Sequence, residues 1–116
     1  MRDHTKLKAF QLADQLVLEV YKATKDFPKE EKFGLTAQMR SSALSIPSNI
    51  VEGCARNTER DYLRFLDIAH GSARELEYQI SLAERLEYFD TDLGNALEKK
   101  SIEVSKVLNG LIKSLR

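Results

Sequence analysis

The chain is poor in the residues that mark several protein classes: it has no tryptophan, one cysteine, two prolines and five glycines in 116 residues. The lone Cys54 cannot form an internal disulfide, which excludes a disulfide-stabilised scaffold and suits a reducing compartment. No apolar run approaches the roughly 20 residues of a membrane-spanning helix. The N-terminal segment MRDHTKLK also has no apolar stretch of the kind found in signal peptides. We therefore expect a cytoplasmic protein.

An excess of either charge is also absent, since 18 basic and 18 acidic residues cancel. A dedicated nucleic-acid-binding domain usually has a basic excess, so any such role here depends on local clustering. The sequence contains no phosphate-binding loop, dinucleotide fingerprint, nucleophile elbow or zinc-type spacing. With no linker-like segment either, we expect a single domain over residues 1–116, no enzymatic activity and no cofactor.

Apolar residues recur every three or four positions in four segments, which predicts helices at residues 6–26, 33–54, 58–86 and 91–115. Thr58 and Thr91 are the expected N-terminal caps of the last two helices. No segment alternates as a strand would. Because the connections are short, consecutive helices should be antiparallel neighbours. The predicted fold is all-α, an up-down-up-down four-helix bundle.

Pro47 interrupts the second predicted helix. Proline removes one backbone hydrogen bond and crowds the carbonyl of Ala43, which leaves either a kinked helix or two abutting helices. The apolar period continues through Ile46 and Ile50. We therefore expect one helix, kinked at Pro47.

The same helix is unusually polar at the edges of its apolar stripe. Asn49 and Glu52 share a face with Ser45, and Arg40 lies about three turns earlier. Such a set could hold a substrate, but unpaired buried charge is costly, which favours a structural network between helices or subunits. Arg40 of the same or a neighbouring subunit would then pair with Glu52. The predicted network comprises Gln38, Arg40, Ser45, Asn49, Glu52 and Glu75.

Two further features are possible sites: a carboxylate–histidine pair and the single cysteine. Asp67 and His70 resemble half of a carboxylate-bundle metal site, but no second carboxylate-x-x-His occurs, so we expect no metal. Cys54 is expected to pack at the end of the second helix.

Arg56, Arg60 and Arg64 recur every four residues and are the best local argument for nucleic-acid contact. Acidic neighbours at Glu59, Asp61 and Asp67 favour instead a solvated, ion-paired helix face.

The third predicted helix has two apolar stripes. One contains Tyr62, Leu66, Ala69, Ala73, Leu76, Ile80 and Ala83, and the other contains Phe65, Ile68, Leu82 and Leu86. A helix with two stripes needs more than one packing partner. Together with the wide stripe of the first helix, this predicts that copies of the chain associate.

The strings FPKEEKFGLTAQMR, SIPSNIVEGCAR and IAHGSARELEYQ resemble, in order and spacing, the bacterial 23S rRNA intervening-sequence proteins. The same fold includes the accessory variability determinant of diversity-generating retroelements. The matching positions include Phe33, Gly34, Leu35, Gln38, Arg40, Ser45, Ile46, Asn49, Ile50, Glu52, Gly53, Gly71, Ser72, Glu75 and Leu76. The resemblance implies a four-helix bundle, rings that are typically homopentamers, and no established enzymatic activity.

The two branches of the family differ in what they imply for partners. The retroelement branch implies a scaffold for RNA and a reverse transcriptase, whereas the ribosomal branch has no settled role. This chain departs from the family pattern at Arg40-Ser41, where two basic residues are frequent, which weakens the transfer of RNA binding. It also departs at Glu87, where glycine is usual.

Overall fold

The computed structural model describes residues 2–116 and contains four long helices. They are α1 (Lys8–Ala23), α2 (Leu35–Cys54), α3 (Glu59–Arg85) and α4 (Thr91–Leu115). Short 3₁₀ helices, His4–Lys6 and Lys29–Glu31, precede α1 and α2. No strand occurs in residues 2–116. The all-α prediction is confirmed, and the predicted helix ends are correct to within about one turn.

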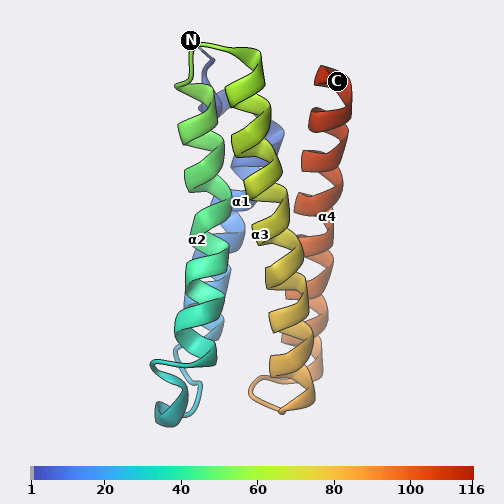
Figure 1. Cartoon of the computed structure of the whole chain (residues 1–116). Coiled ribbons are helices and arrows are strands. Elements are labelled where there is room, and N and C mark those ends of the chain that lie inside the picture. The colour runs from blue at the N-terminus through green and yellow to red at the C-terminus, as the bar shows by residue number, and fades with distance from the viewer. Residues whose placement is uncertain (1) are drawn as a thin grey trace.

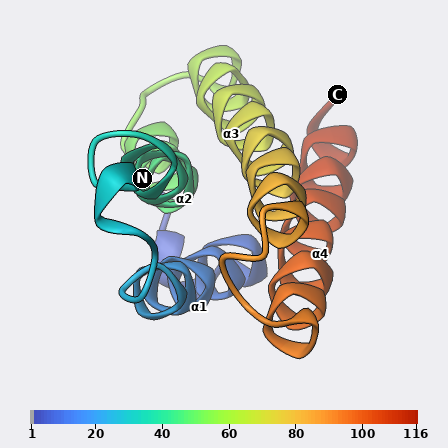
Figure 2. The ribbon, with the colours of Figure 1, turned by 90° about the horizontal axis from the view of Figure 1, so that it is seen from below.

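The four helices form a bundle in which each helix packs against two others. α1 and α3 each pack against both α2 and α4, so that the helices occupy the corners of a four-sided bundle (Figure 2). Consecutive helices run in opposite directions, and both chain ends lie at the same end of the bundle (Figure 1). The molecule measures 43 × 24 × 19 Å along its principal axes. The connection between α1 and α2 lies at the opposite end from the two termini.

The core consists of the apolar stripes that the sequence period predicts. Burying a leucine- or isoleucine-sized side chain stabilises the fold by about 1.5–3 kcal/mol, so these positions dominate stability. The largest fully buried side chains are Leu16, Val20, Met39, Ile46, Ile50, Cys54, Leu66, Leu76, Ile80, Leu97, Val104 and Leu108.

The N-terminal caps of α3 and α4 are side chains that accept a backbone N–H of the first turn. Thr58 Oγ1 accepts the backbone N–H of Asp61 at 3.2 Å, which confirms the predicted cap of α3. Asp90 Oδ1 accepts the backbone N–H of Leu93 at 2.8 Å. The prediction of Thr91 as the cap of α4 is therefore wrong by one residue.

α2 continues without interruption through Pro47, which is buried. The alternative of two abutting helices is excluded, and the kink at Pro47 stays a prediction. A side-chain hydrogen bond spans the helical turn that contains the proline. The Asn49 side-chain amide donates to the backbone carbonyl of Ser45 at 2.8 Å.

Glu31 ties the start of α2 to the connection between α3 and α4. Its carboxylate accepts the backbone N–H of Leu35 at 2.9 Å and the hydroxyl of Tyr88 at 2.8 Å. The hydrogen bond from Leu35, followed by that from Tyr88, lowers the pKa of Glu31 from its ordinary value of 4.5. The ring of Tyr88 also lies 5.2 Å from that of Phe27.

Glu31 should make stability depend on pH on the acidic side. A carboxyl group whose pKa is lowered by folding stabilises the protein above the unfolded-state pKa and loses this effect as pH falls through the folded-state pKa. We expect Glu31→Gln to lower the melting temperature at pH 7, with the difference from wild type shrinking below pH 4.5. Thermal unfolding followed by circular dichroism between pH 2.5 and 7 measures this. Glu30→Gln makes the same charge change in the same turn and should show no such convergence.

α3 ends in a Schellman motif that places Glu87 in an unfavourable backbone conformation. The N–H of Tyr88 donates to the carbonyl of Ala83 and that of Glu87 to the carbonyl of Glu84, both at 3.0 Å. Glu87 is the residue with positive φ (62°), which is costly for any residue with a Cβ atom. This is the position at which the family resemblance implies glycine.

Glu87→Gly should therefore stabilise the protein by about 0.5–1 kcal/mol, because glycine adopts positive φ without steric cost. Urea unfolding monitored by circular dichroism gives the free energy of unfolding. Glu87→Ala is the matched control, since it removes the carboxylate but keeps the Cβ atom. Equal gains from both variants would contradict the backbone explanation.

Candidate functional site

The six residues of the predicted polar network do not form one network. Arg40 faces α1, where its Nε donates to Thr24 Oγ1 at 2.8 Å and its Nη2 donates to the backbone carbonyl of Tyr21 at 3.2 Å. The guanidinium also lies 4.7 Å from the centre of the Tyr21 ring. Thr24 is buried and itself donates to the carbonyl of Val20. Arg40 thus fastens α2 to the C-terminal turn of α1.

A second group forms a polar seam between α2 and α3. The hydroxyls of Ser45 and Ser72 lie 2.8 Å apart, and Asn49 Nδ2 donates to Ser45 Oγ at 2.9 Å. Ser42 Oγ donates to Glu75 Oε1 at 2.7 Å. Ser45 and Glu75 thus take part in contacts between α2 and α3, whereas both hydrogen bonds of Asn49 stay within α2. Ser42 is a member of the seam that the sequence analysis missed, because a serine within an apolar stripe has no spacing that distinguishes it.

Glu52 and Gln38 do not join either group. Glu52 is exposed and forms an ion pair with Arg56, so its predicted pairing with Arg40 is wrong within the chain. Gln38 is exposed, and its side chain makes no hydrogen bond within residues 2–116. Neither residue belongs to a buried network in the protomer, and a contact to a neighbouring subunit stays a prediction.

The three arginines at the other end of α2 come from two parts of the chain. Arg56 lies in the connection between α2 and α3, whereas Arg60 and Arg64 lie on α3. The guanidinium groups of Arg56 and Arg64 both lie over the ring of Phe65, 4.9 and 4.5 Å from its centre.

The acidic residues near these arginines pair differently from what we predicted. Asp67 pairs with Arg116 at 2.6 Å. An open cavity of about 450 Å³ at this end is lined by Arg60, Arg64 and Arg116, but also by Glu59, Asp61 and Asp67. Positive and negative side chains are therefore balanced around it, which does not favour an anion.

The other candidate chemistries find no support in the geometry. Because Asp67 is paired with Arg116, it does not form a site with His70, and no group of three potential metal-ligating side chains gathers in residues 2–116. Cys54 is buried, and burial raises the pKa of its thiol. A buried thiol of raised pKa is a packing residue, as predicted. Within residues 2–116, no helix has the length and apolar character needed to cross a membrane.

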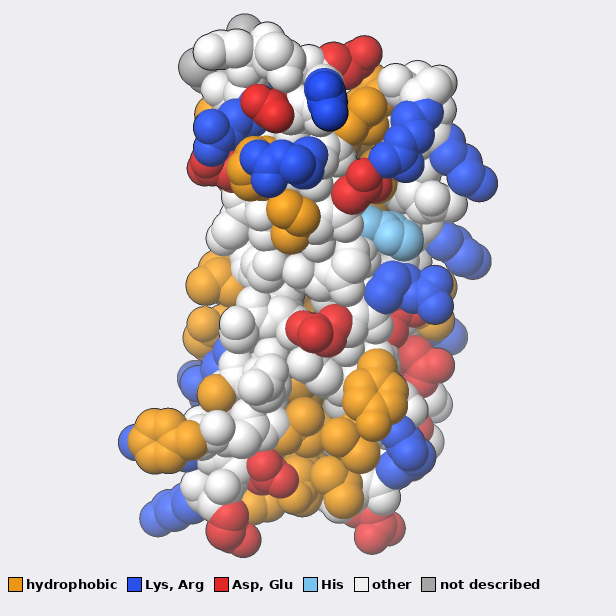
Figure 3. All heavy atoms as spheres, viewed as in Figure 1, with side chains coloured by type: hydrophobic (Ala, Val, Ile, Leu, Met, Phe, Trp, Pro, Cys, Tyr) orange, Lys and Arg blue, Asp and Glu red, His pale blue; other side chains and the backbone are white. Residues whose placement is uncertain are grey.

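The outward surface of α2 differs from that of the other helices in having almost no charge. The helix contains one arginine and one glutamate in 20 residues, and Arg40 is folded onto α1. Figure 3 shows few charged side chains over the middle of the α2–α3 face, whereas charged side chains gather toward α4. Leu44 and Val51 are exposed on α2, at 48% and 37%. We call the exposed residues of α2 from Ala37 to Val51 the α2 surface.

The model of the 23S rRNA-intervening sequence protein family matches residues 5–110. The chain belongs to this family. A crystal structure of a protein of unknown function from the S23 ribosomal protein family of Bacteroides thetaiotaomicron superposes with a TM-score of 0.82. The two chains are 26% identical, and the match covers 90% of this chain and 98% of the other. The comparison with curated proteins finds no match.

This intervening-sequence protein uses one of the family-pattern glycines for close helix packing. A Cβ atom at Gly53 would lie 3.0 Å from Phe65 Cβ and 3.3 Å from the backbone carbonyl of Tyr62. A side chain at Gly53 would therefore require α3 or the Phe65 and Tyr62 side chains to shift by a few tenths of an ångström. The relationship to the retroelement accessory determinant stays a prediction.

The different surroundings of Arg40 and Glu52 can be tested by measuring the free energy of unfolding of variants. Arg40→Ala should lower the free energy of unfolding by about 2 kcal/mol, because it removes charge-assisted hydrogen bonds that join two helices. Glu52→Ala breaks only an exposed pair and should change it by less than about 0.5 kcal/mol. Urea titrations give both values. Arg40→Lys keeps the charge without the two-donor geometry and should fall between them, while equal losses for Arg40→Ala and Glu52→Ala would contradict the assignment.

Proposed function

We propose that this 23S rRNA-intervening sequence protein is a non-enzymatic helical scaffold that works as a homo-oligomer, with the α2 surface as one side of the contact between subunits. The observation that carries the proposal is the uncharged, partly apolar character of that surface. Solvent-facing helix surfaces are normally rich in charge, and the depletion of charge is typical of interface cores. α3, by contrast, has charged residues along its whole length.

Exposed apolar side chains also occur on the helices next to α2. On α1, Tyr21 is exposed beside Arg40. Ile68 on α3 and Leu86, the residue directly after α3, are also exposed, and both belong to the second stripe noted in the sequence. In the wide stripe of α1, Leu16 and Val20 are buried in the protomer's own core.

The energetic argument is that fully burying an exposed apolar side chain contributes about 1.5–3 kcal/mol, and these side chains, which are 37–48% exposed, retain a little under half of that gain. Leu44, Val51 and Ile68 in one interface therefore provide a substantial part of the free energy of association, and a closed ring repeats that interface at every subunit. The homopentamer that the family resemblance implies is the form we propose. An RNA or a reverse transcriptase, in the cytoplasm, is the partner class that such a scaffold would hold by the same resemblance.

Oligomer size provides the test of this proposal. Size-exclusion chromatography with light scattering should give a mass that is a multiple of the 13.2 kDa protomer at micromolar concentration. Leu44→Glu places a charge in the middle of the α2 surface and should shift the protein to monomers, because a buried unpaired carboxylate is costly.

Leu93→Glu is the matched control. Leu93 is also an exposed leucine (38%), but it lies in the first turn of α4, where an acidic residue is favourable. The control should keep the wild-type mass. A monomeric wild type, or dissociation by both variants alike, would overturn the assignment of the interface.

Direct nucleic-acid binding through Arg56, Arg60 and Arg64 is the second candidate. The stacking of Arg56 and Arg64 on Phe65 favours it, since arginine and aromatic planes together contact unpaired bases. The three acidic residues around the adjacent cavity oppose it. We rank it below the scaffold for that reason.

A further inference from the structure

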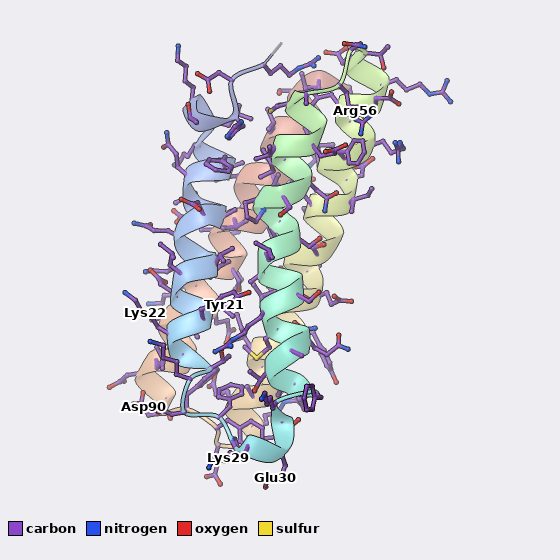
Figure 4. All side chains as sticks on the ribbon, turned by 90° about the vertical axis from the view of Figure 1, so that its left-hand side faces the viewer. Tyr21, Lys22, Lys29, Glu30, Arg56 and Asp90 are labelled. Atoms are coloured by element: carbon purple, nitrogen blue, oxygen red, sulfur yellow. The ribbon has the colours of Figure 1, made fainter. Side chains whose placement is uncertain are left out.

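A second cluster of cations lies at the end of the bundle where α1 connects to α2. An open cavity of about 370 Å³ is found there, and all of its charged lining residues are cations. Its floor contains the hydroxyl-bearing residues Thr24 and Thr36, both buried. Figure 4 shows the location: Tyr21 lies on α1 beside α2, and Lys29 lies at the tip of the connection, at the opposite end from Arg56. The four cations that line the cavity are Lys25, Lys29, Lys32 and Arg40.

These cations lack acidic partners. None of the ion pairs within residues 2–116 involves any of the four. Asp26 and Glu30 are in the same connection, but neither lines the cavity. The carboxylate of Glu31 is already occupied by Leu35 and Tyr88. Four like charges around one cavity repel one another, and a bound anion would relieve that repulsion.

Arg40 is held in place before any ligand binds. Its contacts with Thr24 and with the carbonyl of Tyr21 use two of its five N–H donors, and its guanidinium is stacked on the Tyr21 ring. An arginine fixed by its own protein loses less conformational entropy on binding than a free side chain. The remaining donors are available to phosphate oxygens, for which arginine geometry is well suited.

An exposed aromatic ring stands next to the cavity. Phe33 is 88% exposed, the most exposed of the large apolar side chains in the described residues. The ammonium group of Lys32, which lines the cavity, lies 5.5 Å from the centre of the Phe33 ring. A cationic cavity beside an exposed aromatic ring matches the two parts of a nucleotide, a phosphate and a base that stacks on an aromatic side chain.

We propose that this cavity binds a nucleotide, with the phosphate held by Lys29, Lys32 and Arg40 and the base stacked on Phe33. The nucleotide is either free or one unit of a single strand, since both present the same phosphate and base. The site is separate from the Arg56, Arg60 and Arg64 region, and none of the exposed residues of the α2 surface lines it. It lies close to the proposed subunit contact, because Arg40 stacks on Tyr21. The titrations below test nucleotide binding directly, whatever the oligomeric state.

Isothermal titration calorimetry with the full chain at low salt tests the proposal. ATP and pyrophosphate, without divalent cations, should both bind. Lys29→Gln combined with Lys32→Gln should weaken both by about tenfold or more, because phosphate contacts are predominantly electrostatic. Lys99→Gln combined with Lys106→Gln removes the same charge from exposed positions on α4 and should leave both affinities near wild type.

Phe33→Ala separates the two parts of the ligand. It should weaken ATP by about five- to 150-fold, the range expected for one base-stacking contact, and leave pyrophosphate unchanged. Equal affinity of Phe33→Ala and wild type for ATP would overturn the stacking assignment. No binding of ATP or pyrophosphate to wild type, or equal weakening by the two lysine pairs, would overturn the site.

A single-stranded oligouridine of twelve nucleotides distinguishes the two sources of the ligand. Binding at least about tenfold tighter than ATP, lost in the Lys29→Gln and Lys32→Gln variant, assigns the site to a strand. Binding no tighter than that of ATP assigns it to a free nucleotide. All these variants change exposed side chains, so circular dichroism should give wild-type melting curves.

Discussion

The position of α2 between α1 and α3 is the constraint on which the other features depend. α2 buries its apolar stripe in the core, and it meets its two neighbours by different chemistry. Toward α1 the polar part of the contact is Arg40, which donates to Thr24 and to the backbone carbonyl of Tyr21. Toward α3 it is a seam of serine hydroxyls, with Ser45 on Ser72. The contacts with α3 use uncharged serine hydroxyls, and Arg40 is folded onto α1. Glu52 is the one other charged residue of α2, so the outward surface of the helix has almost no charge.

The helical period was enough to predict the bundle, because core positions such as Ile46, Leu66 and Leu108 obey it directly. It was not enough to predict pairs between helices. Arg40 and Glu52 are twelve residues apart, which at 3.6 residues per turn places them about 120° apart around the helix. They therefore point toward different surroundings, and the actual partners of Arg40 belong to α1, which no spacing within α2 reveals.

The cationic cavity was not predicted from the sequence, because its residues come together only in the fold. Lys25, Lys29 and Lys32 follow no helical period, since the chain turns between α1 and α2, and in sequence they are interleaved with acidic residues. Only the fold brings Arg40 beside these lysines, while Glu31 is directed to Leu35 and Tyr88. By contrast, Arg56, Arg60 and Arg64 have a regular spacing, yet the cavity that Arg60 and Arg64 line at the other end of the bundle is also lined by acidic residues. A local charge pattern is thus a poor guide to net charge in space.

The two proposals are separate in evidence but have a joint physical consequence. A ring built through the α2 surface would contain one cationic cavity per subunit. Repeated sites on a rigid assembly raise the affinity for a ligand that reaches several of them, without any new contact, because later binding events become intramolecular. A free nucleotide fills one cavity and gains nothing from the ring. A single strand could reach several, so self-association would favour strands over free nucleotides even though each cavity recognises the same phosphate and base.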